Sequence, residues 1–144
     1  MICRPATGAD IDAVCADIWQ RGIDELAAFG VTVEDYRRVS LDQAAHGMCW
    51  AFSDDRGPVA LLGLDLIGDG VAETTFQATS RFAGRVGRRA TDAMIEFART
   101  GHGKVLGVRR YVIRSRSNRP GVGKWFKYLG CRESGEGGIY ILEV

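Results

Sequence analysis

Apolar residues near the start of the chain recur with helical spacing. Thr7, followed three residues later by Asp10, resembles a capping box, a common helix start. Beyond it, apolar side chains occupy positions i, i+3, i+4, i+7 and i+8, the stripe of an amphipathic helix, at Ile11, Val14, Cys15, Ile18 and Trp19. One helix through Trp19 is therefore expected, with a short strand before it over residues 2–4.

Two further helices are expected before residue 48. The first is short and covers Asp24 to Phe29. Thr32 with Asp35 repeats the start signal, so the second helix should run from Val33 to about His46, where a glycine follows.

From residue 48 the apolar runs become short and are separated by turn residues, which is typical of strands. Strands are expected over 48–53, 59–67, 71–77, 111–116, 131–133 and 139–144, with helices over 90–100 and 122–129. The main elements follow the order β-α-α-β-β-β-α-β-α-β-β, which predicts a mixed α/β (α+β) domain. At 144 residues with 46% apolar content, the chain is expected to be one domain, 1–144, with its own core.

The net charge of +1 hides an asymmetry. Residues 1–72 carry 5 Lys/Arg and 12 Asp/Glu, whereas residues 73–144 carry 14 and 6. A polyanionic ligand has an electrostatic reason to bind the second half. Two solvated faces of opposite sign are the alternative, and charge alone does not decide between them.

Several classes of protein are disfavoured by composition. The sequence has no run of about 18 apolar residues, so a membrane span is not expected. The first residues lack the layout of a signal peptide, so a cytoplasmic location is expected. The four scattered cysteines, Cys3, Cys15, Cys49 and Cys131, are expected to be reduced core residues. With two histidines and no ligand spacing, no metal site is expected.

The most informative segment is a Gly/Arg-rich turn over residues 79–89, placed between the strand at 71–77 and the helical pattern at 90–100. Glycines let main-chain N–H groups approach a phosphate, a helix N-terminus adds partial positive charge, and arginines reach the phosphate oxygens. The segment therefore predicts a site for a phosphorylated small molecule.

The order of elements and three sequence motifs resemble the GNAT (Gcn5-related N-acetyltransferase) fold over essentially the whole chain. The opening Ile2-Cys3-Arg4-Pro5-Ala6-Thr7 resembles an I-R-P-A-T-x-x-D start. Residues 82–90 resemble the acyl-CoA pyrophosphate loop Q/R-x-x-G-x-G/A, and residues 116–131 resemble the later segment N-x-x-A-x-x-L-Y-x-K-x-G-F.

The resemblance implies an acetyl-CoA or CoA co-substrate and an amine acceptor. Glu73 is then the expected general base, and Asn118 lines the pantetheine side. A splayed gap between the strands at 71–77 and 111–116 admits the thioester. The main-chain N–H groups expected to bind the pyrophosphate are those of Phe82, Ala83, Gly84, Arg85, Val86, Gly87 and Arg88.

Two positions depart from the family pattern. Arg85 stands where the first motif glycine is expected, so its Cβ is an obstacle to close backbone approach, with Gly84 next to it. Phe126, which has no hydroxyl, stands at the position of the tyrosine that often acts as general acid, and Tyr128 points to a different side of the helix.

A narrower resemblance, carried by residues 81–97, the N-terminal Ile-x-Arg-Pro and the segment 118–130, links the chain to GNAT-like internal virion proteins of short-tailed bacteriophages. It implies a non-catalytic role among phage structural proteins, in the host cytoplasm or the virion. A third reading is a nucleic-acid binder that uses the basic second half. The acceptor, the acyl group and association into homo-oligomers stay open.

Overall fold

The computed structural model describes residues 1–117 and 119–144. Its strands form one sheet of order β1-β2-β3-β4-β5-β7-β6, in which every neighbouring pair is antiparallel except β4 with β5. The strands are β1 (Ile2–Pro5), β2 (Cys49–Asp54), β3 (Gly57–Gly68), β4 (Val71–Ala78), β5 (Arg110–Arg114), β6 (Arg132–Glu133) and β7 (Ile139–Glu143). The predicted mixed α/β fold is confirmed.

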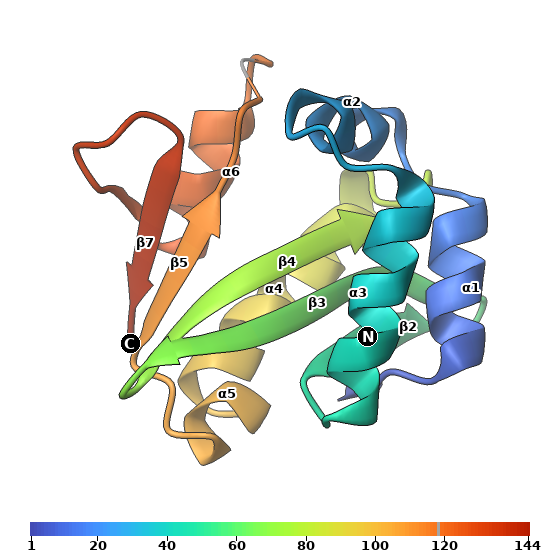
Figure 1. Ribbon diagram of the computed structural model, residues 1–144, viewed down its shortest axis with the longest axis horizontal. Helices are drawn as coiled ribbons and strands as arrows, with labels where there is room; N and C mark the ends of the chain where they lie inside the picture. Colours follow the sequence, from blue (N-terminus) through green and yellow to red (C-terminus); the bar gives the residue numbers. More distant parts are fainter. Residues whose placement is uncertain (118) are drawn as a thin grey trace.

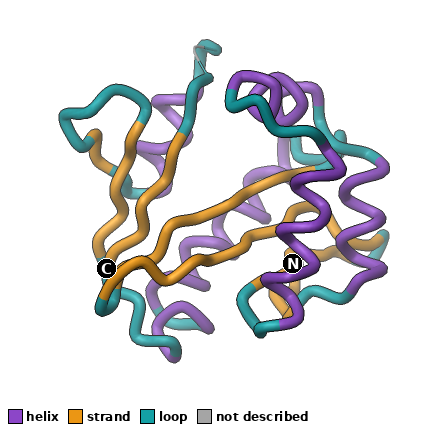
Figure 2. The backbone as a smooth tube through the Cα atoms, in the orientation of Figure 1, coloured by secondary structure: helices purple, strands orange, loops and turns teal. Residues whose placement is uncertain are grey.

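Helices cover both faces of the sheet (Figures 1 and 2). In the view of Figure 1, α1 and α3 lie in front of the sheet, and α4 and α5 lie behind it. The helices are α1 (Gly8–Ala16), α2 (Gln20–Ala28), α3 (Val33–Ala45), α4 (Gly84–Arg99), α5 (His102–Val105) and α6 (Val122–Leu129).

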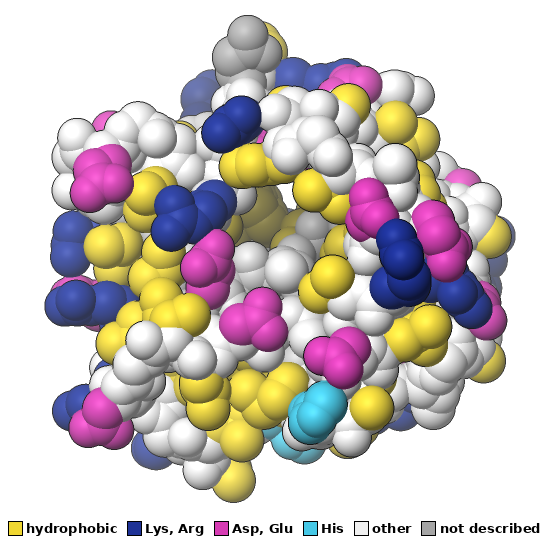
Figure 3. Space-filling view, viewed as in Figure 1, with side chains coloured by type: hydrophobic (Ala, Val, Ile, Leu, Met, Phe, Trp, Pro, Cys, Tyr) yellow, Lys and Arg dark blue, Asp and Glu magenta, His cyan; other side chains and the backbone are white. Residues whose placement is uncertain are grey.

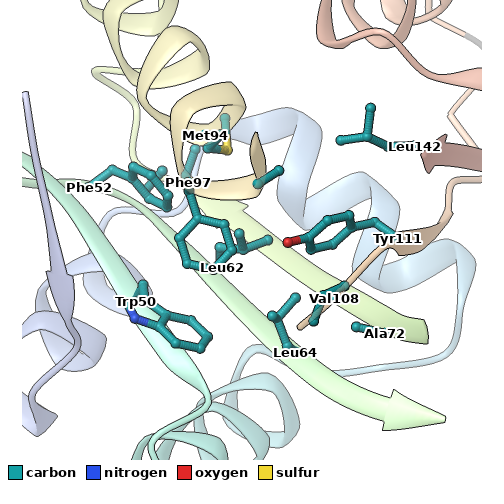
Figure 4. Packing of buried hydrophobic residues seen from close by; sticks show 13 residues of the cluster. Trp50, Phe52, Leu62, Leu64, Ala72, Met94, Phe97, Val108, Tyr111 and Leu142 are labelled. Atoms are coloured by element: carbon teal, nitrogen blue, oxygen red, sulfur yellow. The ribbon is translucent and has the colours of Figure 1, made fainter. Parts of the chain in front are cut away.

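Two apolar layers hold this arrangement. On the α1 and α3 face, Ile11, Val14 and Tyr36 pack on Cys49, Ala51 and Leu61. On the α4 face the larger layer includes Trp50, Phe52 and Phe97, and Figure 4 shows the rings of Trp50 and Phe97 close together above β3. Burial of these side chains is the main stabilising contribution.

The first helix is shorter than its apolar stripe predicts. α1 ends at Ala16 and α2 begins at Gln20, so the expectation of one helix through Trp19 is wrong. The Trp19 N–H donates to the Ala78 carbonyl of β4 at 3.0 Å, and Ile18 bridges Thr79. These contacts with the sheet replace the last helical hydrogen bonds.

The start of α4 also differs from expectation. The helix begins at Gly84, six residues before the helical pattern at 90–100, so the turn is confined to residues 79–83. The arginines that follow Gly84 therefore lie in the first two turns of a helix rather than in a loop.

Helix α2 spans from the sheet to the segment that follows β5. The Glu25 carboxylate accepts the Arg116 N–H at 2.5 Å, and the Arg116 guanidinium donates to the Ala28 carbonyl at 3.0 Å. The Arg116 guanidinium also lies over the Phe29 ring, 4.6 Å from its centroid. α2 thus bridges the top of the opening between β4 and β5 (Figure 1).

Candidate functional site

The sheet opens between its two parallel strands. β4 and β5 pair only over Val71–Glu73 and Arg110–Val112, and beyond these residues the strands separate (Figure 1). Thr79 donates its N–H to a β3 carbonyl at 2.9 Å, so the alternation along a strand directs the main-chain groups of Thr74 and Phe76 away from β3 and into the gap. Main-chain polar groups inside a sheet require partners. The gap therefore suits a ligand that carries amides of its own.

A cavity of about 130 Å³ lies at this gap. Figure 3 shows the surface hollowed near its centre, with hydrophobic side chains at the bottom of the hollow. The polar rim of the cavity includes Arg21, Glu25 and Arg114, and the buried Gln77 and Ser115 also line it. Its apolar wall includes Leu62, Met94, Phe97, Tyr111, Trp125 and Phe126.

A second, more open pocket of about 620 Å³ lies where α4 begins, lined by Ala83 and Gly84 among others. The N–H groups of Phe82, Ala83 and Gly87 already donate to main-chain carbonyls at 3.0, 2.8 and 3.0 Å. By contrast, no preceding helical turn offers a carbonyl to the first three helical amides, and no side chain of the described residues caps them. The donors expected over Phe82 to Arg88 thus narrow to the N–H groups of Gly84, Arg85 and Val86.

Gly84, not Arg85, has the unusual backbone of this turn. Its φ of +52° lies in the left-handed region, and apart from its chain neighbours and the backbone of its own helix no atom lies within 4 Å of the position that a Cβ would take. Gly87 has a different role, since a Cβ there would stand 3.2 Å from the carbonyl carbon of Phe82. Among the described residues only glycines have positive φ. Arg85 therefore stands at the first glycine position of the motif without the strain that a left-handed backbone would cause for a residue with a side chain.

Four aromatic side chains from separate segments stand between the two pockets. Trp19, Phe76, Phe82 and Trp125 pack edge-on or tilted, with ring centroids 5.0 to 6.3 Å apart. Trp19 and Trp125 line both pockets, and so does Arg21. The pocket at α4 and the cavity at the gap are therefore neighbours that share the side chains of Trp19, Arg21 and Trp125 as a common wall.

Glu73 lies on β4 at the last residue pair with β5. Its Oε1 accepts the Nε–H of Arg114 at 2.7 Å, and its side chain is 33% exposed. Thr75, two residues along the same strand face, donates its hydroxyl to Gln43 of α3 at 3.2 Å. Glu73 therefore faces the α1–α3 side; it is not among the residues that line the cavity, and its ion pair with Arg114 connects it to the rim.

Phe126 and Tyr128 point to different sides of α6, as their spacing predicts. Phe126 is 3% exposed, lines the cavity and stacks on Tyr140 of β7 with centroids 4.0 Å apart. The Tyr128 hydroxyl instead donates to Asp92 of α4 at 2.5 Å. The Tyr128 hydroxyl is therefore not available at the position of Phe126.

The arginines of the motif lie on the surface. Arg85, Arg88 and Arg89 are all exposed on α4. Arg88 lines the outer pocket, and its guanidinium lies over the ring of Tyr128, 5.6 Å from the centroid. Asn118, expected on the pantetheine side, lies outside the described residues.

The cysteines occupy core or half-buried positions, and none forms a disulfide in the described part of the chain. Burial raises the pKa of Cys3 and Cys131 to about 11 and that of Cys49 to about 12. Burial also raises the pKa of Cys15. These thiols are therefore protonated at neutral pH.

Over residues 1–117 and 119–144 no three His, Cys, Asp or Glu side chains gather as a metal site would require. In the same residues no helix is both long and apolar enough to cross a membrane.

Sequence reasoning missed two residues that shape the site. The apolar spacing predicts Trp19 on the face of a single helix, whereas its side chain lines both pockets. No sequence pattern predicts that Arg21 belongs to the site, because its neighbours in the sequence form no motif. Arg21 reaches the site because α2 packs against β4, where the Gln77 amide donates to the Gly22 carbonyl at 3.5 Å.

Solved structures with this arrangement define a fold class: the chain has the fold of the GNAT (Gcn5-related) N-acetyltransferases. The PaiA N-acetyltransferase from Thermoplasma acidophilum, solved in complex with coenzyme A, superposes with a TM-score of 0.70 at 13% identity, covering 99% of this chain and 98% of that one.

Two further structures agree. The ribosomal-protein-alanine N-acetyltransferase from Brucella melitensis gives a TM-score of 0.68 at 14% identity over 100% of both chains. The phosphinothricin acetyltransferase from Sinorhizobium meliloti, in complex with AcCoA, gives 0.65 at 12% identity over 99% and 88%. No family model and no curated protein sequence matches the chain.

Proposed function

We propose that the protein is an N-acyltransferase that uses acetyl-CoA, or another acyl-CoA, to acylate an amine. The observation that carries this proposal is the gap between β4 and β5, which lies next to a pocket that borders three free amides of α4 and shares lining residues with it. CoA has groups that match these features: a diphosphate for the free amides of α4, a chain with two amides for the main-chain groups in the gap, and a thioester beyond it.

In this proposal the N–H groups of Gly84, Arg85 and Val86 bind the diphosphate, and the left-handed Gly84 lets them approach it. Phe82, Ala83 and Gly87 shape the loop, and Arg88 adds charge at the pocket rim. Thr74 and Phe76 pair with the pantetheine amides, as a neighbouring strand would. Asn118 is assigned to the same side by the sequence resemblance alone.

Transfer requires a neutral amine, because an alkylammonium with a pKa of about 10 has no lone pair to attack the thioester. Glu73 accepts this proton through a water or after its ion pair with Arg114 opens. The amine nitrogen then bonds to the acyl carbon, the carbon–sulfur bond breaks, and the proton that the nitrogen loses as it becomes an amide passes to the departing thiolate, directly or through water. A thiolate whose thiol has a pKa of about 8.5 can leave before it is protonated, so Phe126 at the tyrosine position is compatible with turnover.

Calorimetric titration with acetyl-CoA tests the proposal. Micromolar binding is expected, and ligand at 100 times Kd should stabilise the fold by about 2.7 kcal/mol, a rise in Tm of roughly 5–10 °C. Neither heat nor a shift in Tm would remove the enzyme interpretation and leave only the fold.

A non-catalytic role is the second candidate, because Glu73 is held by Arg114 and the cavity wall carries Phe126. In this candidate the module serves in phage assembly, a role suggested by the sequence resemblance to internal virion proteins alone. In that case Glu73→Gln leaves biological activity intact. Acyl transfer to any amine at ordinary turnover contradicts this candidate.

A further inference from the structure

Arg21 is a half-buried cation that lines both pockets. Its guanidinium carbon lies 5.2 Å from the Trp19 ring centroid and 5.6 Å from that of Trp125. Within residues 1–117 and 119–144 no carboxylate lies within 4 Å of its nitrogens and no acceptor receives their hydrogens. Stacking on indoles satisfies the faces of a guanidinium but leaves its N–H donors, which lie in the plane, unused.

The other charged groups at the cavity rim already have partners. Arg114 binds Glu73 at 2.7 Å, and the Glu25 carboxylate accepts the Arg116 N–H at 2.5 Å. Burial lowers the pKa of Arg21, and the Glu25 charge raises it in part. A half-buried charge without a hydrogen-bond acceptor is unfavourable. The cavity rim therefore has one cation whose charge Glu25 compensates only in part and whose N–H donors have no acceptor among the described residues.

We propose that Arg21 binds a carboxylate carried by one of the two substrates. A planar guanidinium with free in-plane donors matches a carboxylate in a paired, bidentate geometry. The inner cavity of about 130 Å³ has room for a group of a few atoms. This proposal rests on the proposed function and names its substrate class: a dicarboxylic acyl group on CoA, or an amino-acid acceptor.

Two matched pairs of ligands distinguish these sources. Binding of succinyl-CoA is compared with that of acetyl-CoA by calorimetry. Acylation of leucine is compared with that of isoamylamine, the same amine without its carboxylate, by release of CoA thiol. The parent protein should favour the carboxylate in one pair by about tenfold or more, the scale of a hydrogen-bonded charge pair.

Arg21→Gln should reduce this ratio to about one, and Arg21→Lys, which keeps the charge but not the fork, should retain part of it. Arg88→Gln is the matched control, because Arg88 lines only the outer pocket. It should weaken all CoA species together and leave the ratio unchanged. Retained melting temperatures show that each variant is folded.

Two results would overturn the proposal. The first is that the parent protein does not prefer the carboxylate ligand in either pair. The second is that Arg21→Gln loses the same affinity for CoA, acetyl-CoA and succinyl-CoA, because an equal loss indicates that Arg21 contacts the phosphates that all three share. If the parent binds no CoA species, the proposed function fails separately. Fluorescence of Trp19 and Trp125 then reports titration with free succinate or leucine. A response that Arg21→Gln abolishes supports carboxylate binding, and no response in the parent rejects it.

Discussion

Asp65 of β3 stands directly opposite Glu73 of β4, so two carboxylates share one face of the sheet. Their partners differ. Asp65 accepts a hydrogen bond from the Gln43 amide at 3.3 Å, whereas Glu73 binds Arg114 of the next strand. The two residues have the same charge and neighbouring positions, but only Glu73 is coupled to the cavity rim. They form a matched pair for testing catalysis.

Glu73→Gln should lower kcat by about 10²–10⁴ while CoA affinity stays near that of the parent, because a general base contributes to chemistry rather than to binding. Asp65→Asn, with the same loss of charge, should retain kcat. Steady-state thiol release with a saturating amine measures both. Equal kcat for Glu73→Gln and the parent would assign the base elsewhere.

Gly84→Ala should weaken CoA binding and destabilise the fold by about 1–2 kcal/mol, since an L side chain is unfavourable in the left-handed region. Gly47, with φ +72° and open space around its Cα, provides the control. Gly47→Ala should lose similar stability and retain CoA binding. Urea denaturation measures the loss of stability, and calorimetry measures the loss of CoA affinity. If Gly47→Ala lost as much CoA affinity as Gly84→Ala, Gly84 would have no specific role in binding the ligand.

Asp10 should contribute stability that depends on pH. Burial raises the pKa of its carboxyl, but hydrogen bonds from Arg4 at 2.6 and 2.8 Å and from Thr7 outweigh burial and lower it. A lowered pKa means that the stabilisation is complete above the unfolded pKa of about 3.9 and is lost as the pH falls through the lower folded pKa. Asp10→Asn should therefore cost about 1–3 kcal/mol at pH 7 and much less at pH 2.

Urea denaturation of the parent and Asp10→Asn at both pH values measures this difference. Asp35→Asn alters the second capping box, where Asp35 is partly exposed and pairs with Arg38, so its loss at pH 7 should be smaller. A loss for Asp10→Asn of the same size at pH 7 and pH 2 would show that packing, not charge, is responsible.

The cysteines should resist alkylation in the native state. At pH 8 a thiol with a pKa of about 11 or 12 is almost entirely protonated, and only the thiolate reacts quickly. Iodoacetamide should therefore label Cys3, Cys49 and Cys131 slowly until urea unfolds the chain. Mass spectrometry of timed samples gives the rates, and rapid native labelling of Cys49 would contradict its burial.

Local patterns predict the elements of this fold well. Thr7 with Asp10 and Thr32 with Asp35 both form capping boxes, and the apolar stripe of α6 is buried as expected. The residues that form a capping box or an apolar stripe lie within one or two helical turns of one another. All of them can therefore be recognised in the sequence alone.

The errors and omissions come from contacts between distant residues. Trp19 continues a helical stripe, but its N–H bonds to Ala78, 59 positions away, and this contact ends the helix early. The pairing of Glu73 with Arg114 depends on the register of two parallel strands that no local pattern specifies. Arg21 becomes notable only when two indoles from separate segments surround it.

Three residue pairs join β4 to β5, and α2 bridges the other end of their opening through Arg116. The backbone pairing that sets the angle between the two halves of the sheet is therefore short. A molecule seated in the opening contacts both halves and restricts that angle, so binding strength and stiffness are thermodynamically linked. Substitutions at the short seam should then alter affinity without touching the ligand, and amide exchange along β4 and β5 should slow when the opening is filled.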